Sequence, residues 1–290
     1  MVNTYQETQL VSVLMTAFNR EKYIAEAIQS VLNSTYSNFE LIIVDDCSTD
    51  RTVEIAKTFA VTESRISLYV NQKNLDQFPN RNRAAAFAKG ELIVTVDSDD
   101  TIKPDALEYI VKQFKHFPNA QFALVYGQDD IKVPTSFQPE ESIRKHFYRS
   151  NHLLVGPGGT VIKTDFFKKI GGFPINYGPA GDCFYNIKAA SNAEVILLPY
   201  IFFNYRIHGD QEFFRSESYL YNNYLYFNDA LQLPELPLSP HEKNRLRMKN
   251  KRSFILNSLK FLFNTGKLKE TIRAYHFAGF GIKEILTSLF

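Results

Sequence analysis

The chain has 290 residues, 44% of them hydrophobic, and a formal net charge of +2. A chain of this length can bury a large core, either as one large domain or as one domain with a smaller additional part. No stretch approaches the roughly 18 consecutive apolar residues of a membrane-spanning helix. Cys47 and Cys183 are too few for a disulfide framework, and the N-terminus lacks the pattern of a signal peptide, so we expect a cytoplasmic protein.

The charge is distributed unevenly along the chain. Residues 241–290 contain eleven Lys and Arg against three Glu, a net charge of +8. The preceding 240 residues therefore carry −6, and the basic excess lies at one end of the chain.

Hydrophobic periodicity predicts alternating strands and helices over the first hundred residues. Short apolar runs predict strands at 10–15, 41–44, 66–70 and 92–96. Apolar residues at helical spacing predict helices over 24–32, 48–60 and 79–90 between those strands. By the right-handed crossover rule, this order predicts an α/β fold with a mainly parallel sheet and helices on both faces.

The last of these strands ends in an acidic cluster, in the run ELIVTVDSDD of residues 91–100. Asp97 and Asp99 stand at i and i+2, so an extended backbone sends both side chains to the same side. Two carboxylates on one side are hard oxygen ligands that suit Mg²⁺ or Mn²⁺ holding a phosphate.

Polar residues also follow the other predicted strands. Thr16, Asp46 and Asn71 stand just beyond the first, second and third strands, as Asp97 does beyond the fourth. Open α/β sheets bind their ligands at the carboxyl ends of their strands. The sequence therefore predicts one crevice that all four positions line.

Several stretches resemble the nucleotide-sugar glycosyltransferases of family 2, which have the GT-A fold. They are SVLMTAFNREKYIAEAIQSVLNSTYSNFELIIVDDCSTDRT, RNRAAAFAKGELIVTVDSDD and TIKPDALE. The resemblance is strong over residues 10–115 and patchier to about residue 208. It implies a nucleotide-diphospho-sugar donor, most often a UDP-sugar, and a divalent Mn²⁺ or Mg²⁺ cofactor.

The resemblance also implies roles for individual residues. Thr16, Phe18 and Asp46 are expected near the nucleobase of the donor, and Arg81 is expected near the predicted crevice. Asp97 and Asp99 match the aspartate-any-aspartate (DXD) metal motif.

Three positions depart from the family pattern. The family more often has Pro at Thr16, Tyr at Phe18 and Gly at Cys47. These changes do not remove the predicted pocket. They do not determine which nucleobase the pocket prefers.

Transfer to a neutral hydroxyl also needs a carboxylate base on the acceptor side. The candidate is Asp182 in GPAGDCFYNIKAA, where the family motif is usually Glu-Asp and Gly181 replaces the Glu. A single base without an evident nucleophile implies one displacement with inversion at C1, an interpretation that rests mainly on the resemblance. A divalent cation held by Asp99 would neutralise charge on the leaving diphosphate.

Two further segments of the second half have less specific signals. The YRIH ending at residue 208 resembles a family element near the diphosphate, so His208 is a candidate third metal ligand or phosphate partner. The glycine-rich turn at 156–159 would let an acceptor or phosphate approach the backbone, or it is simply a tight turn.

Each assignment has a structural alternative. The acidic cluster at Asp97 can be solvated side chains before a helix start, and Asp46 and Asp182 can be helix caps. Arg81 can be a solvated helix residue, and His208 can be an ordinary loop residue. A calcium-binding loop starting at Asp97 is excluded because Ile102 occupies the position that requires glycine.

We expect a catalytic domain over residues 1–215, with a nucleotide-sugar half at about 10–115 and an acceptor half at about 116–215. A helical extension would follow over 216–290, with a Pro-rich linker at 234–240. The basic helices of 241–290 fit peripheral contact with the inner face of a membrane, or packing on the catalytic domain or on a second copy in a homodimer. Nucleic acid is a weaker partner because no basic-aromatic platform accompanies the charge.

The sequence therefore predicts a cytoplasmic, metal-dependent, inverting glycosyltransferase with a polysaccharide, lipid-linked oligosaccharide or similar surface glycan as acceptor. One alternative is a non-catalytic nucleotide-sugar-binding or scaffold protein of the same fold, which Gly181 favours. A sugar nucleotidyltransferase is disfavoured because TAFNREKYI, after the first strand, contains no glycine to hold a triphosphate.

Overall fold

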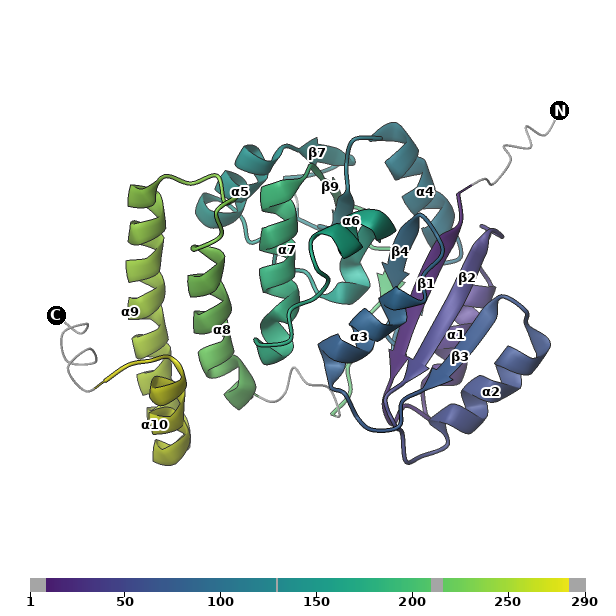
Figure 1. Ribbon diagram of the computed structural model, residues 1–290, viewed down its shortest axis with the longest axis horizontal. Helices are drawn as coiled ribbons and strands as arrows, with labels where there is room; N and C mark the ends of the chain where they lie inside the picture. Colours follow the sequence, from purple (N-terminus) through teal and green to yellow (C-terminus); the bar gives the residue numbers. More distant parts are fainter. Residues whose placement is uncertain (1–8, 129, 210–215, 282–290) are drawn as a thin grey trace.

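A mixed β-sheet forms the centre of the computed structural model, which describes residues 9–281 apart from residue 129 and residues 210–215 (Figure 1). Within these residues, eight strands are ordered β3-β2-β1-β4-β8-β6-β9-β7. They are β1 (Val11–Ala17), β2 (Phe39–Asp45), β3 (Ile66–Val70), β4 (Leu92–Thr95), β6 (Phe122–Val125), β7 (Thr135–Phe137), β8 (Thr160–Lys163) and β9 (Val195–Leu198).

The predicted α/β fold class is confirmed. Strands β3, β2, β1 and β4 are parallel neighbours, as the crossover rule predicts. The strand β8 lies between β4 and β6 and is antiparallel to both, and β7 is antiparallel to β9. The sheet is therefore parallel over the predicted nucleotide-sugar half and mixed beyond it.

Helices cover both faces of the sheet because side chains alternate along each strand. On β1, Val13 and Met15 pack with α1, α2 and α4, whereas Leu14 packs with α3, α6 and α7 on the other face. The helices of the sheet region are α1 (Ile24–Leu32), α2 (Thr52–Thr62), α3 (Gln77–Ala86), α4 (Ala106–His116), α5 (Pro139–Tyr148), α6 (Thr164–Lys169) and α7 (Gly181–Asn192), with 3₁₀ turns η1 (Pro157–Gly159) and η2 (Gly178–Ala180).

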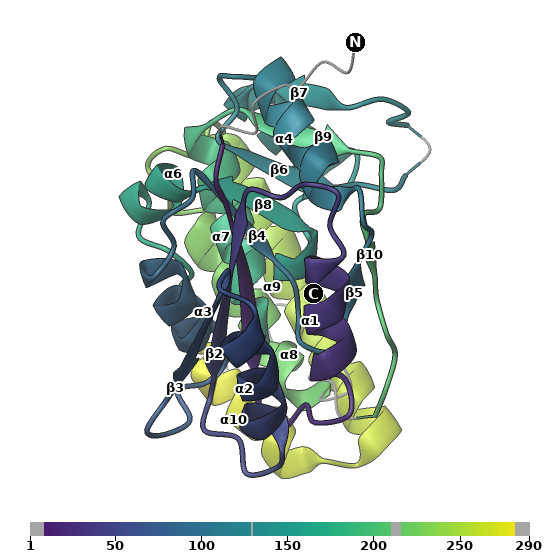
Figure 2. The same ribbon diagram turned by 90° about the vertical axis from the view of Figure 1, so that its right-hand side faces the viewer.

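A small second sheet connects two distant segments. Strand β5 (Thr101–Ile102) pairs antiparallel with β10 (Phe203–Asn204), beside α1 in Figure 2. Because β5 begins directly after Asp100, this pairing brings the segment that follows β10 to the acidic end of β4.

The C-terminal part of the chain contains α8 (Ser216–Ala230), α9 (Pro240–Thr265) and α10 (Leu268–Phe277). Helices α7, α8 and α9 stand side by side, progressively farther from the sheet (Figure 1). Tyr226 and Leu231 of the α8 region and Leu246 of α9 belong to the same apolar core as Leu14 of the sheet. Segment 216–281 thus continues the core of the sheet before it forms a small core of its own around Phe254.

Local signals define the limits of α9. The Ser239 side chain accepts a hydrogen bond from the Glu242 backbone nitrogen, and the Glu242 carboxylate accepts one from the Ser239 backbone, with Pro240 at the first helical position. Gly266, with a φ of 67°, ends the helix in the left-handed conformation that glycine favours. The predicted Pro-rich linker therefore leads directly into a capped helix. Among the described residues, no helix combines the length and the apolar character needed to cross a membrane.

Candidate functional site

The candidate site lies at the carboxyl edge of the parallel strands. Ala17 pairs with Asp45 across β1 and β2, and Asp45 pairs with Val70 of β3. Thr16, Asp46, Asn71 and Asp97 therefore stand at the same edge, as predicted.

Asp46 is buried and organises the loop after β3. Its Oδ1 accepts hydrogen bonds from Asn71 Nδ2 at 2.6 Å and from the backbone nitrogen of Leu75 at 2.8 Å. Asn71 Nδ2 also donates to Asn80 Oδ1 at 2.8 Å. Asp46 thus links β2 to the 71–75 loop, which makes it more than the cap of the following helix. Cys47 adopts a φ of 65°, a left-handed conformation that glycine meets at lower cost and that accounts for the family's preference for Gly there.

Thr16 and Phe18 lie at the end of β1. The Thr16 carbonyl accepts a hydrogen bond from Ser98 Oγ at 2.8 Å, which ties β1 to the acidic segment. The Phe18 side chain is 42% exposed. An exposed ring here is available to stack on a planar ligand.

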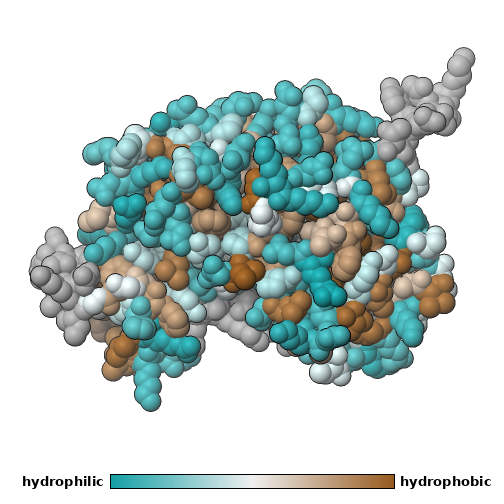
Figure 3. Space-filling view, in the orientation of Figure 1, coloured by the Kyte–Doolittle hydropathy of each residue, from teal (hydrophilic) through white to brown (hydrophobic). Residues whose placement is uncertain are grey.

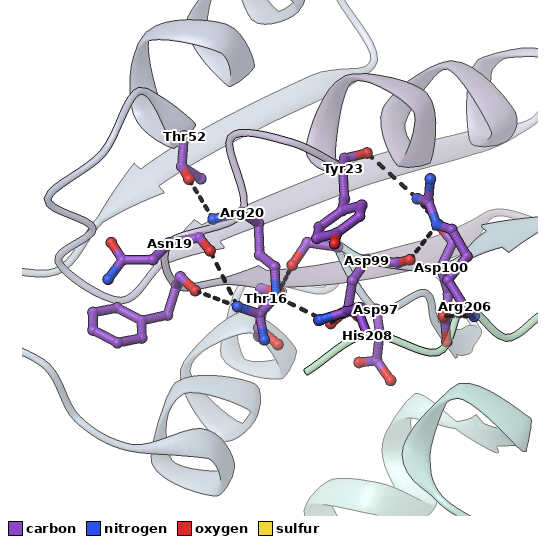
Figure 4. A network of polar contacts seen from close by, with 12 residues as sticks. Thr16, Asn19, Arg20, Tyr23, Thr52, Asp97, Asp99, Asp100, Arg206 and His208 are labelled. Carbon is purple, nitrogen blue, oxygen red and sulfur yellow. Dashed lines mark hydrogen bonds and ion pairs between the residues drawn. The ribbon is translucent and has the colours of Figure 1, made fainter. Parts of the chain in front are cut away.

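Asp99 receives two nitrogen donors from distant parts of the chain. Its Oδ2 lies 3.0 Å from Arg20 Nε and 3.0 Å from His208 Nε2 (Figure 4). The His208 ring in turn stacks on Tyr23, with ring centroids 4.6 Å apart. The structure therefore places the predicted residues Asp99 and His208 together and adds Arg20, which the sequence did not indicate.

Arg206 holds the segment of His208 against the end of β4. Its backbone nitrogen donates to Asp100 Oδ1 at 2.9 Å, and its guanidinium contacts the Asp99 carbonyl and the Glu26 carboxylate. Burial raises the pKa of Asp100 to about 7, and the carboxylates of Asp97 and Asp99 add to the increase. Asp100 thus anchors the 205–208 segment.

Arg81 is only 6% exposed and points to Asp97, with Nη2 2.5 Å from Asp97 Oδ1. Its Nε and Nη1 are buried and have no hydrogen-bond partner among the described residues. Buried unpaired guanidinium donors are costly, so they indicate a place for an anionic or polar ligand. Arg81 lies in α3, but the alternative that it is a solvated helix residue is wrong because it is buried.

Asp182, from the other half of the chain, is close enough to Arg81 for the guanidinium to influence its pKa. It lies in the first turn of α7, and its Oδ1 accepts a hydrogen bond from the Cys183 backbone nitrogen at 2.7 Å. Burial raises the pKa of Asp182 to about 6, although Arg81 opposes the increase. A carboxyl group with this pKa can take up a proton near neutral pH.

The glycine-rich turn η1 lies beside both acids. A Cβ on Gly158 would stand 3.5 Å from Asp97 Oδ2, and one on Gly156 would stand 3.8 Å from Asp182 Oδ2. The turn is therefore part of the site. Only the backbone of Gly156 and Gly158 lies beside Asp182 and Asp97 at these two positions.

Gly181 is packed too closely to carry a side chain. A Cβ there would stand 2.7 Å from Cε2 of Phe78 and 3.0 Å from the Pro174 carbonyl oxygen. The ring of Phe78 thus occupies space that the family's usual Glu would need, and Asp182 has no acidic neighbour in the chain at this position.

The acids at the end of β4 suit a divalent cation only in part. Within the described residues, Asp97 Oδ2 and Asp99 Oδ1 have no hydrogen-bond donor, so two hard oxygen ligands remain for a metal. Among all residues that the structure describes, no group of three or more His, Cys, Asp or Glu side chains is arranged to hold a metal ion. Oxygens of a bound diphosphate would therefore have to complete the coordination, as is usual for Mg²⁺.

Residues 12–171 match the sequence model of Glycosyl transferase family 2, which covers more than half of the chain. The chain belongs to this family. The resemblance expected from its motifs is thereby confirmed.

Curated glycosyltransferases match parts of the chain. An uncharacterized glycosyltransferase of Methanocaldococcus jannaschii is 35% identical over 173 residues, 56% of this chain and 58% of that protein. Glycosyltransferase GlyG of Streptococcus pneumoniae is 35% identical over 106 residues, 37% of this chain and 35% of that protein. The chain matches little more than half the length of these relatives, or less.

Solved structures show the same GT-A fold over nearly the whole chain. TarS residues 1–349 of S. aureus, crystallised with UDP-GlcNAc, has a TM-score of 0.70 and 22% identity and covers 91% of this chain and 79% of that one. The mannosyltransferase PcManGT of Pyrobaculum calidifontis, in complex with GDP-Man and Mn²⁺, has a TM-score of 0.65 and 18% identity and covers 96% and 85%. At these identities the similarity establishes the fold alone.

Proposed function

We propose that this family 2 protein transfers a sugar from a nucleotide-diphospho-sugar, most simply a UDP-sugar, to a hydroxyl acceptor with inversion at C1. The observation that carries the proposal is that the glycine-rich turn at 156–159 lies beside both Asp97 and Asp182, and that Arg81, which has two unpaired buried donors, contacts Asp97 and opposes the increase that burial causes in the pKa of Asp182. A leaving diphosphate needs positive charge, and an attacking hydroxyl needs a base. Arg81 is the candidate for the positive charge, and Asp182 is the candidate for the base.

In this proposal Asp46, Thr16 and Phe18 hold the nucleoside. Asp46 fixes the 71–75 loop, and the exposed Phe18 ring offers an apolar face. Arg81 donates from Nε and Nη1 to the donor, because these buried atoms need acceptors.

Asp97 and Asp99 would hold Mn²⁺ or Mg²⁺, and His208 would join them or contact the diphosphate. A bound cation would neutralise the negative charge that develops on the leaving diphosphate. Arg20 and His208 already point nitrogen donors at Asp99 Oδ2, so they orient the carboxylate and leave its Oδ1 for the metal.

Asp182 would remove the proton of the acceptor hydroxyl as that oxygen attacks C1. Gly156 and Gly158 place only backbone beside the two acids, so no side chain at these two positions blocks an acceptor. We propose a saccharide or lipid-linked acceptor and a cytoplasmic location, in keeping with the free thiols of Cys47 and Cys183.

A non-catalytic nucleotide-sugar-binding role is the second candidate. It is favoured by one observation, the Phe78 ring in the space where the family's Glu would stand. Such a protein would bind donor without releasing nucleoside diphosphate.

Donor binding tests the proposal through thermal unfolding with a panel of UDP-, GDP- and dTDP-sugars, with and without Mn²⁺. We expect one class of nucleotide sugar to raise the Tm of the wild-type protein only when Mn²⁺ is present, because ligand binding stabilises the folded state. Asp99→Ala should abolish this increase.

The matched control is Asp165→Ala, which removes an exposed carboxylate from the first turn of α6. This variant should keep the full Tm increase. A metal-dependent increase that is the same in Asp99→Ala and in the wild type would contradict the metal assignment.

A further inference from the structure

The outer face of α9 and α10 carries a mixed basic and apolar surface. On α9, residues at positions i, i+4, i+7, i+11, i+15 and i+18 are exposed and opposite to the buried face of Phe254, Ile255 and Ser258. We define the α9–α10 basic surface as these residues, Arg245, Lys249, Arg252, Leu256, Lys260 and Phe263, together with Leu268, Lys269, Ile272 and Arg273 of α10.

The charge of this surface is nearly all of one sign. Residues 245–281 contain nine Lys and Arg and one acidic residue, Glu270. The cations of the α9–α10 basic surface form no ion pair with any acidic side chain that the structure describes. The surface therefore has a positive potential that a partner can use.

Large apolar side chains lie among these cations. Phe263 is 83% exposed, Ile272 58% and Leu268 55%. Figure 3 shows apolar and hydrophilic side chains mixed at the lower left end of the molecule, where Figure 1 places the end of α9 and α10. An ordinary solvated face is mostly polar, so grouped exposed apolar residues indicate a contact surface.

We propose that the α9–α10 basic surface docks on an anionic phospholipid bilayer. Lysine and arginine are attracted to anionic head groups, and Phe263, Leu268 and Ile272 can enter the boundary with the acyl chains. A symmetric pairing of this face with the same face of a second copy is disfavoured, because it would place two positive surfaces against each other.

The end of the α9–α10 basic surface lies toward the same edge of the molecule as the carboxyl ends of the strands (Figure 1). In Figures 1 and 2, β1 descends from the N-terminus toward the lower edge of the molecule, and the end of α9 and α10 lie at that same edge. The carboxyl ends of the strands and α10 therefore lie toward the same edge of the molecule, whereas α9 runs along its side (Figures 1 and 2). This placement suits an acceptor that is attached to a lipid.

Sedimentation with phosphatidylcholine vesicles, with and without phosphatidylserine, tests the docking on the full chain. We expect the wild-type protein to bind only vesicles that contain phosphatidylserine and to dissociate at high salt. The triple variant Arg252→Glu, Lys260→Glu and Lys269→Glu should bind at least about a hundredfold more weakly, since each basic residue adds to the attraction.

The matched control makes the same charge change elsewhere, at the exposed residues Lys57 of α2 and Lys112 and Lys115 of α4. The control triple Lys57→Glu, Lys112→Glu and Lys115→Glu should lose much less binding than the α9–α10 triple. Phe263→Ser should weaken binding about tenfold without any change of charge.

Three results would overturn the inference: no binding of the wild-type protein, an equal loss in both triple variants, or a wild-type dimer that the α9–α10 triple dissociates. None of the substituted residues belongs to the candidate site. Failure of vesicle binding would therefore leave metal-dependent donor binding, and with it the proposed function, untouched.

Discussion

Asp99 and Asp182 have opposite surroundings at the candidate site, in keeping with their different proposed roles. Asp99 is contacted by two nitrogen groups, Arg20 and His208, which orient its carboxylate and leave Oδ1 for the proposed metal. Asp182 lies in a buried position that raises its pKa to about 6. One acid is thus suited to hold positive charge, and the other to accept a proton.

The raised pKa of Asp182 predicts that Asp182→Asn stabilises the protein at alkaline pH. The pKa rises from an ordinary value of 3.8 to about 6 on folding, so the folded state holds the proton more tightly and the wild type loses stability as pH rises through this interval. An amide avoids that loss while keeping the oxygen that Cys183 contacts. Urea unfolding at pH 4 and pH 8 should show a gain for Asp182→Asn of up to about 3 kcal/mol at pH 8 only.

The control for this measurement is the exposed Asp165→Asn, which should change stability little at either pH. An equal effect of Asp182→Asn at both pH values would show that the folded protein does not disfavour the ionised carboxylate.

The sequence identified the acids of the site better than their partners. Asp46, Asp97 and Asp99 follow strands, and parallel strands end at one edge, so topology alone predicts that they converge. Arg20 is 79 residues from Asp99, and no spacing rule joins them. Arg206 is likewise brought to Asp100 only by the pairing of β10 with β5.

At the scale of elements, the start of α7 depends on its contact with α3. Gly181→Ala would place a methyl group 2.7 Å from the Phe78 ring, which is itself buried in the core. We expect a loss of about 1–3 kcal/mol in the free energy of unfolding, because neither the ring nor the Pro174 carbonyl can move freely. Urea denaturation measures this loss.

A second substitution distinguishes this contact from a general effect of alanine. Gly209→Ala meets open space and should be nearly neutral, whereas Phe78→Leu should recover part of the stability of Gly181→Ala. Additive effects of Phe78→Leu and Gly181→Ala would contradict the steric account.

The helices and strands of residues 10–96 were predictable because their apolar residues recur at helical or strand spacing. The predicted strand at 66–70 and the helix at 24–32 coincide with β3 and α1. The predicted helix at 79–90 is wrong at both ends, because α3 begins at Gln77 and ends at Ala86. The apolar run of β8 predicts a strand but not its direction, which depends on the neighbours β4 and β6.

At the scale of the whole molecule, the C-terminal region supports the candidate base. Helix α8 packs on η2 and α7, where the Tyr226 hydroxyl contacts the Cys183 thiol and Tyr177 donates to Asp229 Oδ2 at 2.9 Å. The turn before Asp182 is thus held from outside the sheet. A charge count shows the basic end of the chain, but only the fold shows that α8 and the start of α9 complete the core whereas the end of α9 and α10 remain exposed.

The most direct test of the proposed function measures nucleoside diphosphate release from the bound sugar nucleotide, with Mn²⁺ and a saccharide acceptor, for the wild type and Asp182→Asn. We expect release by the wild type to rise with pH around a midpoint near 6, because Asp182 acts as a base only when ionised. Asp182→Asn should bind donor normally and release product about a thousandfold more slowly. Release by Asp182→Asn at the wild-type rate would contradict the account.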